Sequence, residues 1–284
     1  MNKTPMVSVI IAIKNEEKNI RRLLKSVRRQ TYKNLEVIVV DNNSTDQTKR
    51  IAGHFTKKVF NKGPERSAQR NFGVKKARGK FVLILDADME LTAKVVESCI
   101  NNIDDHKALI IPERTVGKSF VARVRAFERA MYMGDPSIEV ARFFERKIFN
   151  EFGGYDLSLT GPEDYDLPYR ISKRYSIGRA TKYILHHEED MTIGRLLRKK
   201  FYYARKGARY ARKHPELVAT QGNLLFRKAY FRNWKKFVEN PLLGLSFIFV
   251  RALEATWAVG GYISEVGFRG LTRTLLVSLN KQRT

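Results

Sequence analysis

The sequence predicts an α/β fold with a mostly parallel central sheet flanked by helices, followed by a C-terminal helical extension. Three observations predict it: short apolar runs alternate with segments of helical periodicity, acidic residues follow the apolar runs, and one long apolar stretch lies near the C-terminus. Alternating strands and helices are typical of parallel βαβ units with right-handed crossovers. A chain of 284 residues is long enough for one large domain, or for one domain with an appendage.

The alternation is clearest near the N-terminus. Apolar runs predict strands at Val7–Ile13 and Leu35–Val40. Helical spacing predicts a helix at Ile20–Val27, which ends before the polar segment 30–34. Ser44–Gln47 has the pattern of a capping box that opens a second helix.

The next elements continue the sheet. The pattern predicts a short strand at Val59–Asn61, a helix at Ser67–Ala77 closed by Gly79, and a buried strand at Phe81–Leu85. The alternation then loosens. The sequence predicts helices over 92–101, 120–133 and 193–213, a strand over 108–111, and a loop followed by a helix within 150–170.

Two carboxylates, Asp86 and Asp88, directly follow the Phe81–Leu85 strand. Ligands bind open α/β folds at the carboxyl ends of the strands. Two oxygen ligands at such an edge could hold one divalent cation, Mg²⁺ or Mn²⁺, and through it a diphosphate. The alternative is that Asp86 caps the next helix and Asp88 is merely solvated.

The composition is strongly basic, with a net charge of +25 and a pI near 10.2. Such a charge implies an anionic partner, which could be nucleic acid, an anionic membrane surface or a phosphorylated substrate. The single cysteine, Cys99, excludes an intrachain disulfide framework and fits a reducing compartment. The short polar N-terminus lacks the pattern of a secretory signal, so we expect a cytoplasmic location.

Further polar residues could share the crevice with Asp86. Asp41 ends the second strand as Asp86 ends its own, and it could accept a hydrogen bond from a base or cap a helix instead. Arg66 and Arg70 lie one helical turn apart after a glycine turn and suit a phosphate. The alternative for each arginine is a place on a solvated basic face.

A second acidic cluster, Glu163, Asp164 and Asp166, follows a loop rich in glycine and proline. A general base needs a carboxylate close to an acceptor hydroxyl, which Glu163 and Asp164 fit, whereas Asp166 would stabilise a helix N-terminus. His186 and His187 follow an apolar strand. They could complete a metal shell, or be hydrogen-bonded surface histidines.

Taken together, these motifs resemble the family 2 glycosyltransferases of the GT-A fold over about residues 5–213. The individual motifs are short, but their order and spacing are specific. The matching segments are Val7–Ile11 with Asn15–Glu17, Val39–Asp46, Arg70-Asn71 with Gly73, Leu85–Asp88, Gly153–Asp156 and Glu163–Leu167.

The resemblance implies an inverting transfer from a nucleotide-diphosphate sugar. It implies that Glu16 and Asp41 contact the nucleotide base or ribose, and that Arg70 lies near the phosphates. Asp88 would be the principal metal ligand, with Asp86 near the ribose and the metal, and His186 and His187 remain candidates for the metal shell.

The resemblance also implies that Asp164 deprotonates the acceptor. The chain departs from the family pattern at Ala12 and Ile13, which replace the usual Pro-Thr in a contact made mostly by the backbone. The Gln-x-x-Arg-Trp motif of processive synthases is absent from the sequence, as are their multiple membrane spans. We therefore expect the transfer of a single sugar.

The basic segment 193–213 interleaves Arg and Lys with Phe and Tyr, which fits an anionic membrane as well as nucleic acid. The apolar stretch 241–263 is about long enough to span a bilayer, but Arg251 and Glu254 lie inside it. We therefore expect a helix that lies in the membrane interface or packs on the domain, rather than one that crosses the bilayer.

The sequence thus predicts a glycosyltransferase domain over 1–215 and a membrane-proximal extension over 216–284. We expect an enzyme of cell-envelope polysaccharide synthesis at the cytoplasmic face of the membrane, acting on a lipid-linked or membrane-proximal acceptor. One alternative is a nucleotidyltransferase of similar fold, although the glycine-rich, lysine-bearing loop of that class is absent after the first strand. The other is a basic nucleic-acid-binding protein, which leaves Asp86, Asp88 and Asp164 without a role.

Overall fold

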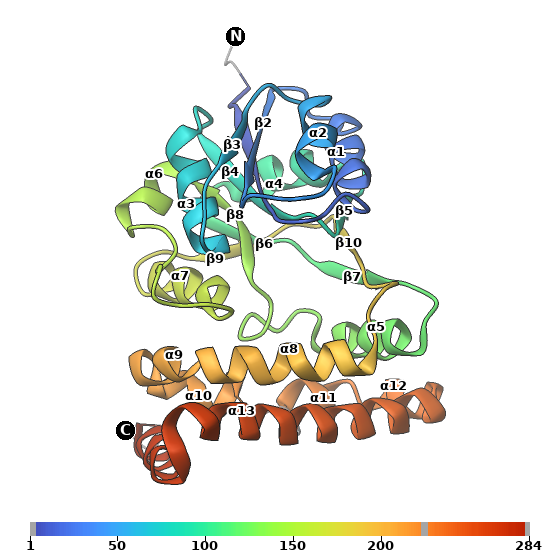
Figure 1. The fold of residues 1–284 in the computed structure, drawn as a ribbon, viewed down its shortest axis with the longest axis vertical. Helices are drawn as coiled ribbons and strands as arrows, with labels where there is room; N and C mark the ends of the chain where they lie inside the picture. Colours follow the sequence, from blue (N-terminus) through green and yellow to red (C-terminus); the bar gives the residue numbers. More distant parts are fainter. Residues whose placement is uncertain (1–3, 223–226, 282–284) are drawn as a thin grey trace. The chain divides into compact units, whose positions relative to one another are not determined.

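The computed structural model describes residues 4–222 and 227–281, which fold into two compact units (Figure 1). The first unit comprises 1–114, 140–157 and 163–187, and the second comprises 115–139, 158–162 and 188–284. The second unit therefore includes three segments, 115–139, 158–162 and 188–215, that lie before the domain boundary expected from the sequence.

A seven-stranded sheet forms the centre of the first unit, in the order β3-β2-β1-β4-β8-β6-β9. Strands β1, β2, β3 and β4 are parallel to one another, whereas β8 runs antiparallel to both of its neighbours, β4 and β6. The strands are β1 (Val7–Ile13), β2 (Leu35–Asp41), β3 (Val59–Asn61), β4 (Phe81–Asp86), β6 (Ala108–Ile110), β8 (Ala141–Glu145) and β9 (Ile177–Arg179).

Helices cover both faces of this sheet. Side chains alternate between the two faces along each strand, and the buried strands carry apolar residues on both. Val9 and Ile11 of β1 join the cluster that contains α1 (Ile20–Arg28) and α4 (Val95–Ile103), whereas Ile10 joins the cluster on the other face. That second cluster contains residues of α3 (Arg66–Lys76), α6 (Arg146–Glu151) and α7 (Glu163–Ser172). The α/β prediction is confirmed.

Several local expectations needed correction. The chain after β4 enters a short strand, β5 (Met89–Leu91), so Asp86 does not cap a helix. Strand β5 pairs with β10 (Ile184–His187) in a three-stranded sheet completed by β7 (Glu113–Val116). The expected capping box is also wrong: α2 (Thr48–Gly53) begins after it, because the Ser44 side chain donates to Asp41 instead.

The second unit, as far as the structure describes it, is helical. The longest helix, α13, packs along α8 and α5, and non-helical backbone at Gly267 divides it. The expected helix over 193–213 is broken at Gly207. The helices are α5 (Phe120–Tyr132), α8 (Ile193–Lys206), α9 (Ala208–Lys213), α10 (Pro215–Gln221), α11 (Lys228–Arg232), α12 (Lys235–Glu239) and α13 (Pro241–Lys281).

A network of buried charges joins three helices of this second unit. Arg251 of α13 lies 2.8 Å from Glu128 of α5, and it also pairs with Glu254 one turn along its own helix. Lys200 of α8 lies 3.4 Å from Glu254. Burial alone would raise the pKa of Glu128, but the positive charges of Arg125 and Arg251 hold it well below its usual range. Each buried charge therefore depends on its partners in the other helices.

We predict that Arg251→Leu destabilises the second unit by about 3–5 kcal/mol, because it leaves two buried carboxylates without their shared partner. Both tryptophans, Trp234 and Trp257, lie in this unit, so their fluorescence during urea unfolding reports on it. The control is Arg269→Leu, at an exposed arginine of the same helix. Equal unfolding midpoints for the two variants would contradict the prediction.

A buried carboxylate also stabilises the sheet of the first unit. Glu36 of β2 accepts hydrogen bonds from the Ser8 hydroxyl at 2.5 Å and from the backbone N–H of Arg78 at 2.6 Å, and it pairs with Lys58. Burial would raise the pKa of Glu36, but the bonds from Lys58, Ser8 and Arg78 outweigh it and lower the pKa to about 2. The charged form thus stabilises the fold.

We expect this contribution to vary with pH in a defined window. A carboxylate whose pKa is about 2 in the folded protein and near 4.5 when unfolded stabilises the fold above pH 4.5, and its contribution is lost as the pH falls toward 2. In Glu36→Gln, the unfolding midpoint of the first unit should be lower at pH 7 and less dependent on pH between 4.5 and 2. Chemical denaturation followed by circular dichroism measures both effects, and an unchanged pH dependence would refute the assignment.

Candidate active site

The candidate site lies at the carboxyl ends of β1, β2 and β4. Strand β1 is central: Ala12 pairs with Asp86 of β4, and Ile13 pairs with Asp41 of β2. Asp41 and Asp86 therefore flank the same strand end, as the sequence predicted from their positions. The Ile13 carbonyl already accepts from the N–H of Asn42 and from Gln69 Nε2, both at 2.9 Å. Gln69 thereby fixes the strand end at which the two acids lie.

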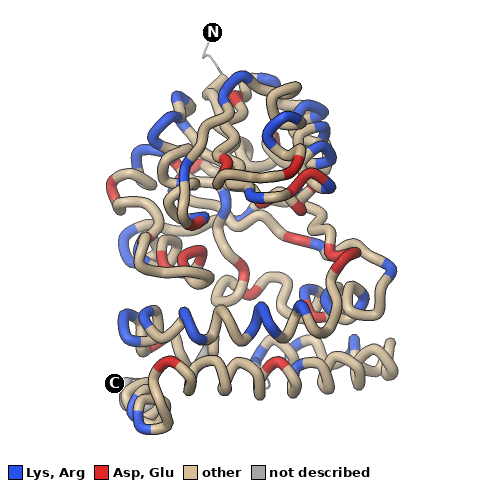
Figure 2. Tube along the Cα trace, viewed as in Figure 1, with Lys and Arg blue, Asp and Glu red and all other residues tan. Residues whose placement is uncertain are grey.

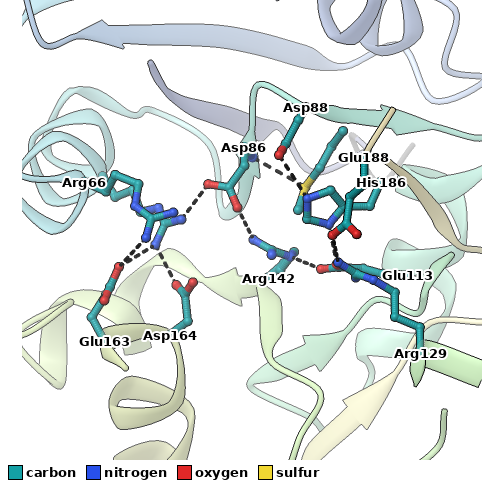
Figure 3. A network of polar contacts seen from close by, with 12 residues as sticks. Arg66, Asp86, Asp88, Glu113, Arg129, Arg142, Glu163, Asp164, His186 and Glu188 are labelled. Carbon is teal, nitrogen blue, oxygen red and sulfur yellow. Dashed lines mark hydrogen bonds and ion pairs between the residues drawn. The ribbon is translucent and has the colours of Figure 1, made fainter. Parts of the chain in front are cut away.

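Arg70 of α3 is the centre of a polar network with Asp86, Glu163 and Asp164, three residues that Figure 3 labels. Its side chain is 0% exposed, and its guanidinium lies 2.6 Å from Asp86 and 2.6 Å from Asp164. Glu163 lies 3.4 Å from the same guanidinium. Arg70 thus links the end of β4 to the start of α7. With three carboxylates around it, Arg70 does not present its guanidinium to a phosphate in this conformation.

The pKa values follow from these contacts. Burial would lower the pKa of Arg70, but Asp164 and Asp86 raise it well above its ordinary value. Burial likewise would raise the pKa of Asp86, but Arg70 and Arg142 hold it far below its usual range. Burial and the charge of Asp164 raise the pKa of Glu163. Arg70 and Asp86 are therefore both charged at neutral pH.

Asp164 and Arg66 are the more accessible members of this cluster. The Asp164 side chain is 17% exposed, so its carboxylate meets Arg70 on one side and keeps access to solvent. Arg66 lies one turn before Arg70 on α3, 3.9 Å from Glu163, with 38% of its side chain exposed. Of the two arginines proposed for phosphate, Arg66 is the one whose side chain reaches the surface.

Two residues that sequence reasoning missed, Arg142 and Glu113, extend the network. Arg142 of β8 lies 3.3 Å from Asp86 and 2.6 Å from Glu113. Glu113 in turn lies 3.0 Å from Nδ1 of His186, as the dashed lines in Figure 3 show. Arg142 is a charged residue directly before the apolar pair Phe143 and Phe144 in strand β8, and that position is the signal by which the sequence could have revealed it.

His186 connects this network to Asp88. Its Nε2 lies 3.1 Å from Asp88 Oδ2, so each ring nitrogen faces a carboxylate oxygen. Carboxylates only accept, so each nitrogen must either carry a proton or share a cation with its carboxylate. The other Asp88 oxygen, Oδ1, is buried and has no hydrogen-bond partner among the described residues. An orphaned carboxylate oxygen beside an imidazole fits a divalent cation.

The metal ligands expected from the sequence do not all converge. Asp86 is held by two guanidinium groups, and Nε2 of His187 lies 3.0 Å from Glu90, so neither faces Asp88 in this conformation. Within the described residues, no three His, Cys, Asp or Glu side chains form a metal-binding group. Of the expected metal ligands, only Asp88 and His186 lie together within the part of the chain that the structure describes. Such a partial site fits a cation that takes its remaining ligands from water and a diphosphate.

Other expected site residues have local partners. Asp41 is buried, and its carboxylate accepts from the Ser44 N–H at 2.9 Å, so it shapes the turn after β2. Asp166 is buried and lies 2.8 Å from Arg170, which also donates to the Gly154 carbonyl. Asp166 therefore stabilises, through Arg170, the turn that contains Gly154.

Glu16 lies in the loop after β1, where its carboxylate accepts from Asn19 at 2.9 Å. Burial raises the pKa of Glu16, and the negative charges of Asp88 and Asp86 raise it further. The neighbouring residues tie this loop to the loop after β2: Asn15 Oδ1 accepts from the Thr45 N–H, and Glu17 accepts from the Gln47 N–H. The two loops form one rim beside the strand-end acids.

Comparisons with known proteins agree with this architecture. The model of the family "Glycosyl transferase family 2" matches residues 8–157, which is more than half of the chain. Similar curated proteins include putative glycosyltransferase EpsH of Bacillus subtilis, which is 32% identical over 115 residues. That match covers 38% of this chain and 33% of EpsH, so the chain spans only a third of that relative.

A second relative is the GalNAc(5)-diNAcBac-PP-undecaprenol beta-1,3-glucosyltransferase of Campylobacter jejuni. It is 26% identical over 217 residues, which are 67% of this chain and 68% of the relative. The pre-mycofactocin glycosyltransferase of Mycobacterium tuberculosis is 25% identical over 240 residues, which are 75% of this chain and 49% of the relative.

Solved structures share the fold at low identity. The mannosyltransferase PcManGT of Pyrobaculum calidifontis, in complex with GDP-Man and Mn²⁺, superposes with a TM-score of 0.57 at 18% identity, covering 92% of this chain and 74% of that one. S. aureus TarS 1-349 in complex with UDP gives 0.53 at 18% identity, covering 93% and 91%. The fold is that of the GT-A transferases, and the chain belongs to glycosyl transferase family 2.

Proposed function

We propose that this protein transfers one sugar from a nucleotide-diphosphate sugar to a lipid-linked acceptor, with inversion at the anomeric carbon and with the help of a divalent cation. The observation that carries the proposal is the continuous chain of charges from Asp164 through Arg70 and Asp86 to Arg142, Glu113, His186 and Asp88. This chain of contacts connects Asp164, which is suited to activate an acceptor, with Asp88, which is suited to bind a diphosphate through a cation.

The donor would bind at the rim formed by the loops after β1 and β2. Its nucleoside would lie beside Glu16 and the backbone of Ala12 and Ile13, and its diphosphate would point toward Asp88. Arg66 supports this placement because its exposed guanidinium can form paired hydrogen bonds with phosphate oxygens. Asp86, held by Arg70 and Arg142, would position the ribose and the metal shell.

Asp88 and His186 would hold the cation. When bound, it would neutralise the negative charge that develops on the leaving nucleoside diphosphate. Glu113 supports this arrangement by facing Nδ1 of His186, since a carboxylate behind a histidine fixes the orientation of the ring toward a metal.

Asp164 would take the proton from the acceptor hydroxyl while that hydroxyl attacks the anomeric carbon from the face opposite the leaving group. The partial exposure of Asp164 supports this role, because an acceptor must reach the carboxylate. Glu163, buried behind it and in contact with Arg70, would position the base rather than touch the substrate.

The lipid-linked acceptor rests on two observations. The Campylobacter relative is named for an undecaprenol-linked substrate, and α13 carries the one segment among the described residues that is long and apolar enough to cross a membrane. The transfer would take place at the cytoplasmic face of the membrane. Product analysis by NMR with a panel of nucleotide sugars and polyprenol-linked acceptors tests the reaction, and retention of the donor's anomeric configuration would refute the inverting assignment.

We predict that Asp88→Asn weakens the binding of nucleoside diphosphates at least about tenfold in the presence of Mn²⁺ or Mg²⁺, because the amide is a poorer ligand than the carboxylate. Titration calorimetry with and without EDTA measures the effect, since the variant and the EDTA-treated wild type should bind alike. Glu90→Gln, which changes a carboxylate paired with His187, is the matched control. A metal effect that survives in Asp88→Asn would exclude Asp88 as the ligand.

We expect Asp164→Asn to slow sugar transfer by roughly 10²–10⁴-fold, as for the loss of a general base, while the affinity for the donor nucleotide stays within about twofold. Single-turnover kinetics with a radiolabelled donor measure the rate. Glu151→Gln, which changes a surface carboxylate paired with Arg174, should transfer at the wild-type rate. A near-normal rate in Asp164→Asn would rule out this base.

A further inference from the structure

A surface helix in water normally buries its apolar face and exposes its charged residues, and the first half of helix α13 does the opposite. Between residues 241 and 264 the sequence contains two charged residues, Arg251 and Glu254, and both are buried within the second unit. Large apolar side chains lie on the exposed side, with Leu245 65% and Phe249 61% exposed. A helix that buries its charges and exposes its apolar residues is suited to a non-aqueous phase on its outer face.

The exposed apolar surface continues into the two short helices before α13. Phe231 of α11 and Trp234, directly before α12, are 68% and 57% exposed. Arg232 lies between them along the chain and Lys235 follows Trp234, and both basic residues are exposed. We define the docking surface as the exposed side chains of Phe231, Trp234, Val238, Leu242, Leu245 and Phe249.

The contacts on the buried face of α13 indicate whether this helix crosses a membrane or lies on its surface. Arg251 and Glu254 pair with Glu128 of α5 and Lys200 of α8, so α13 is packed against these helices. At Gly261, a Cβ atom would lie 2.3 Å from the Phe201 carbonyl oxygen, which shows how closely α13 approaches α8. If α13 crossed the bilayer, it would carry α8 into the hydrocarbon.

Helix α8 is unsuited to hydrocarbon. Its exposed side chains include Arg195, Arg198, Arg205 and Lys206, and a charge at the centre of a bilayer is strongly unfavourable. Figure 2 shows Lys and Arg residues spread along α8 and few of them along α13. Crossing is therefore unfavourable, although the length and hydropathy of α13 alone would permit it.

We propose that α11, α12 and the first half of α13 seat the enzyme in one leaflet of an anionic membrane, with the docking surface among the lipid chains and α13 parallel to the membrane plane. The apolar side chains enter the leaflet, and Arg232 and Lys235 lie at the level of the anionic headgroups. This inference deepens the proposed function, because it specifies how the enzyme meets a lipid-linked acceptor.

The two tryptophans of the chain, Trp234 and Trp257, are 57% and 42% exposed and lie in this region, so the wild-type protein carries its own probes. Vesicles of phosphatidylglycerol and phosphatidylcholine should shift their emission to the blue, and lipids brominated near the headgroup should quench them more than lipids brominated at the chain ends. Vesicles of phosphatidylcholine alone should bind at least tenfold more weakly. Unchanged emission with anionic vesicles, or stronger quenching from the chain ends, would overturn the proposal.

The double variant Leu245→Glu, Phe249→Glu should reduce binding to anionic vesicles at least tenfold in a flotation assay. Leu157→Glu, at a leucine 63% exposed in the first unit, should bind as the wild type does. Both variants should keep the thermal stabilisation by a panel of nucleoside diphosphates. That readout needs no membrane, so a failure of membrane docking is distinguished from a failure of the proposed donor site. Equal flotation of the two variants would overturn the proposal.

Labelling of single cysteines distinguishes a helix α13 that lies on the membrane surface from one that crosses the bilayer. Cys99 is buried, so Asn240→Cys and Arg269→Cys each supply one accessible thiol on either side of the apolar segment. With protein added to intact vesicles, a membrane-impermeant maleimide should label both variants to the same extent, before and after detergent is added. Protection of Arg269→Cys until detergent is added would show a crossing helix and overturn the proposal.

Discussion

The candidate active site depends on the buried guanidinium of Arg70. It lies on a helix between two parts of the chain that are distant in sequence, the end of β4 and the start of α7, and it contacts a carboxylate of each. A planar group with several N–H donors can satisfy these acceptors at once, which the single ammonium of lysine could not do in the same geometry. In the proposed function, this one side chain therefore positions both the acceptor side and the donor side of the site.

The same principle governs the second unit, where Glu128 of α5, Arg251 and Glu254 of α13, and Lys200 of α8 pair with one another across three helices. Around Arg70 and Arg251, desolvation offsets most of the attraction between the buried charges, so removing one partner costs more than the intact network contributes. The apolar clusters around them supply the main driving force for folding. The outer surfaces differ: Arg66 and Asp88 are partly exposed near the strand edge of the first unit, whereas α13 exposes Leu245 and Phe249.

The sequence predicted the parallel half of the sheet well because its signals are local. Strands β1 and β3 have the expected bounds, and β2, α3 and β4 differ from them by one residue. Strand β8 was missed because its antiparallel place between β4 and β6 depends on partners far along the chain. Arg142 was missed with it.

The roles of individual site residues were harder to predict than their positions. The sequence placed Arg70 correctly on a helix, but it could not show that acids 16, 93 and 94 residues away converge on it. It likewise listed His186 and His187 together, although neighbouring residues of a strand point to opposite faces and only His186 faces Asp88. Long-range geometry decides such questions.

The division of the chain between the two units affects the order in which the protein folds during synthesis. The first unit is complete once residue 187 has been made, whereas α5 belongs to the second unit and buries its apolar face against α13, about 110 residues further on. At a synthesis rate of about 5–20 residues per second, the apolar face of α5 is made several seconds or more before α13. During this interval, Val121, Phe127 and Met131 of the nascent chain lack the apolar face of α13 that covers them in the folded protein.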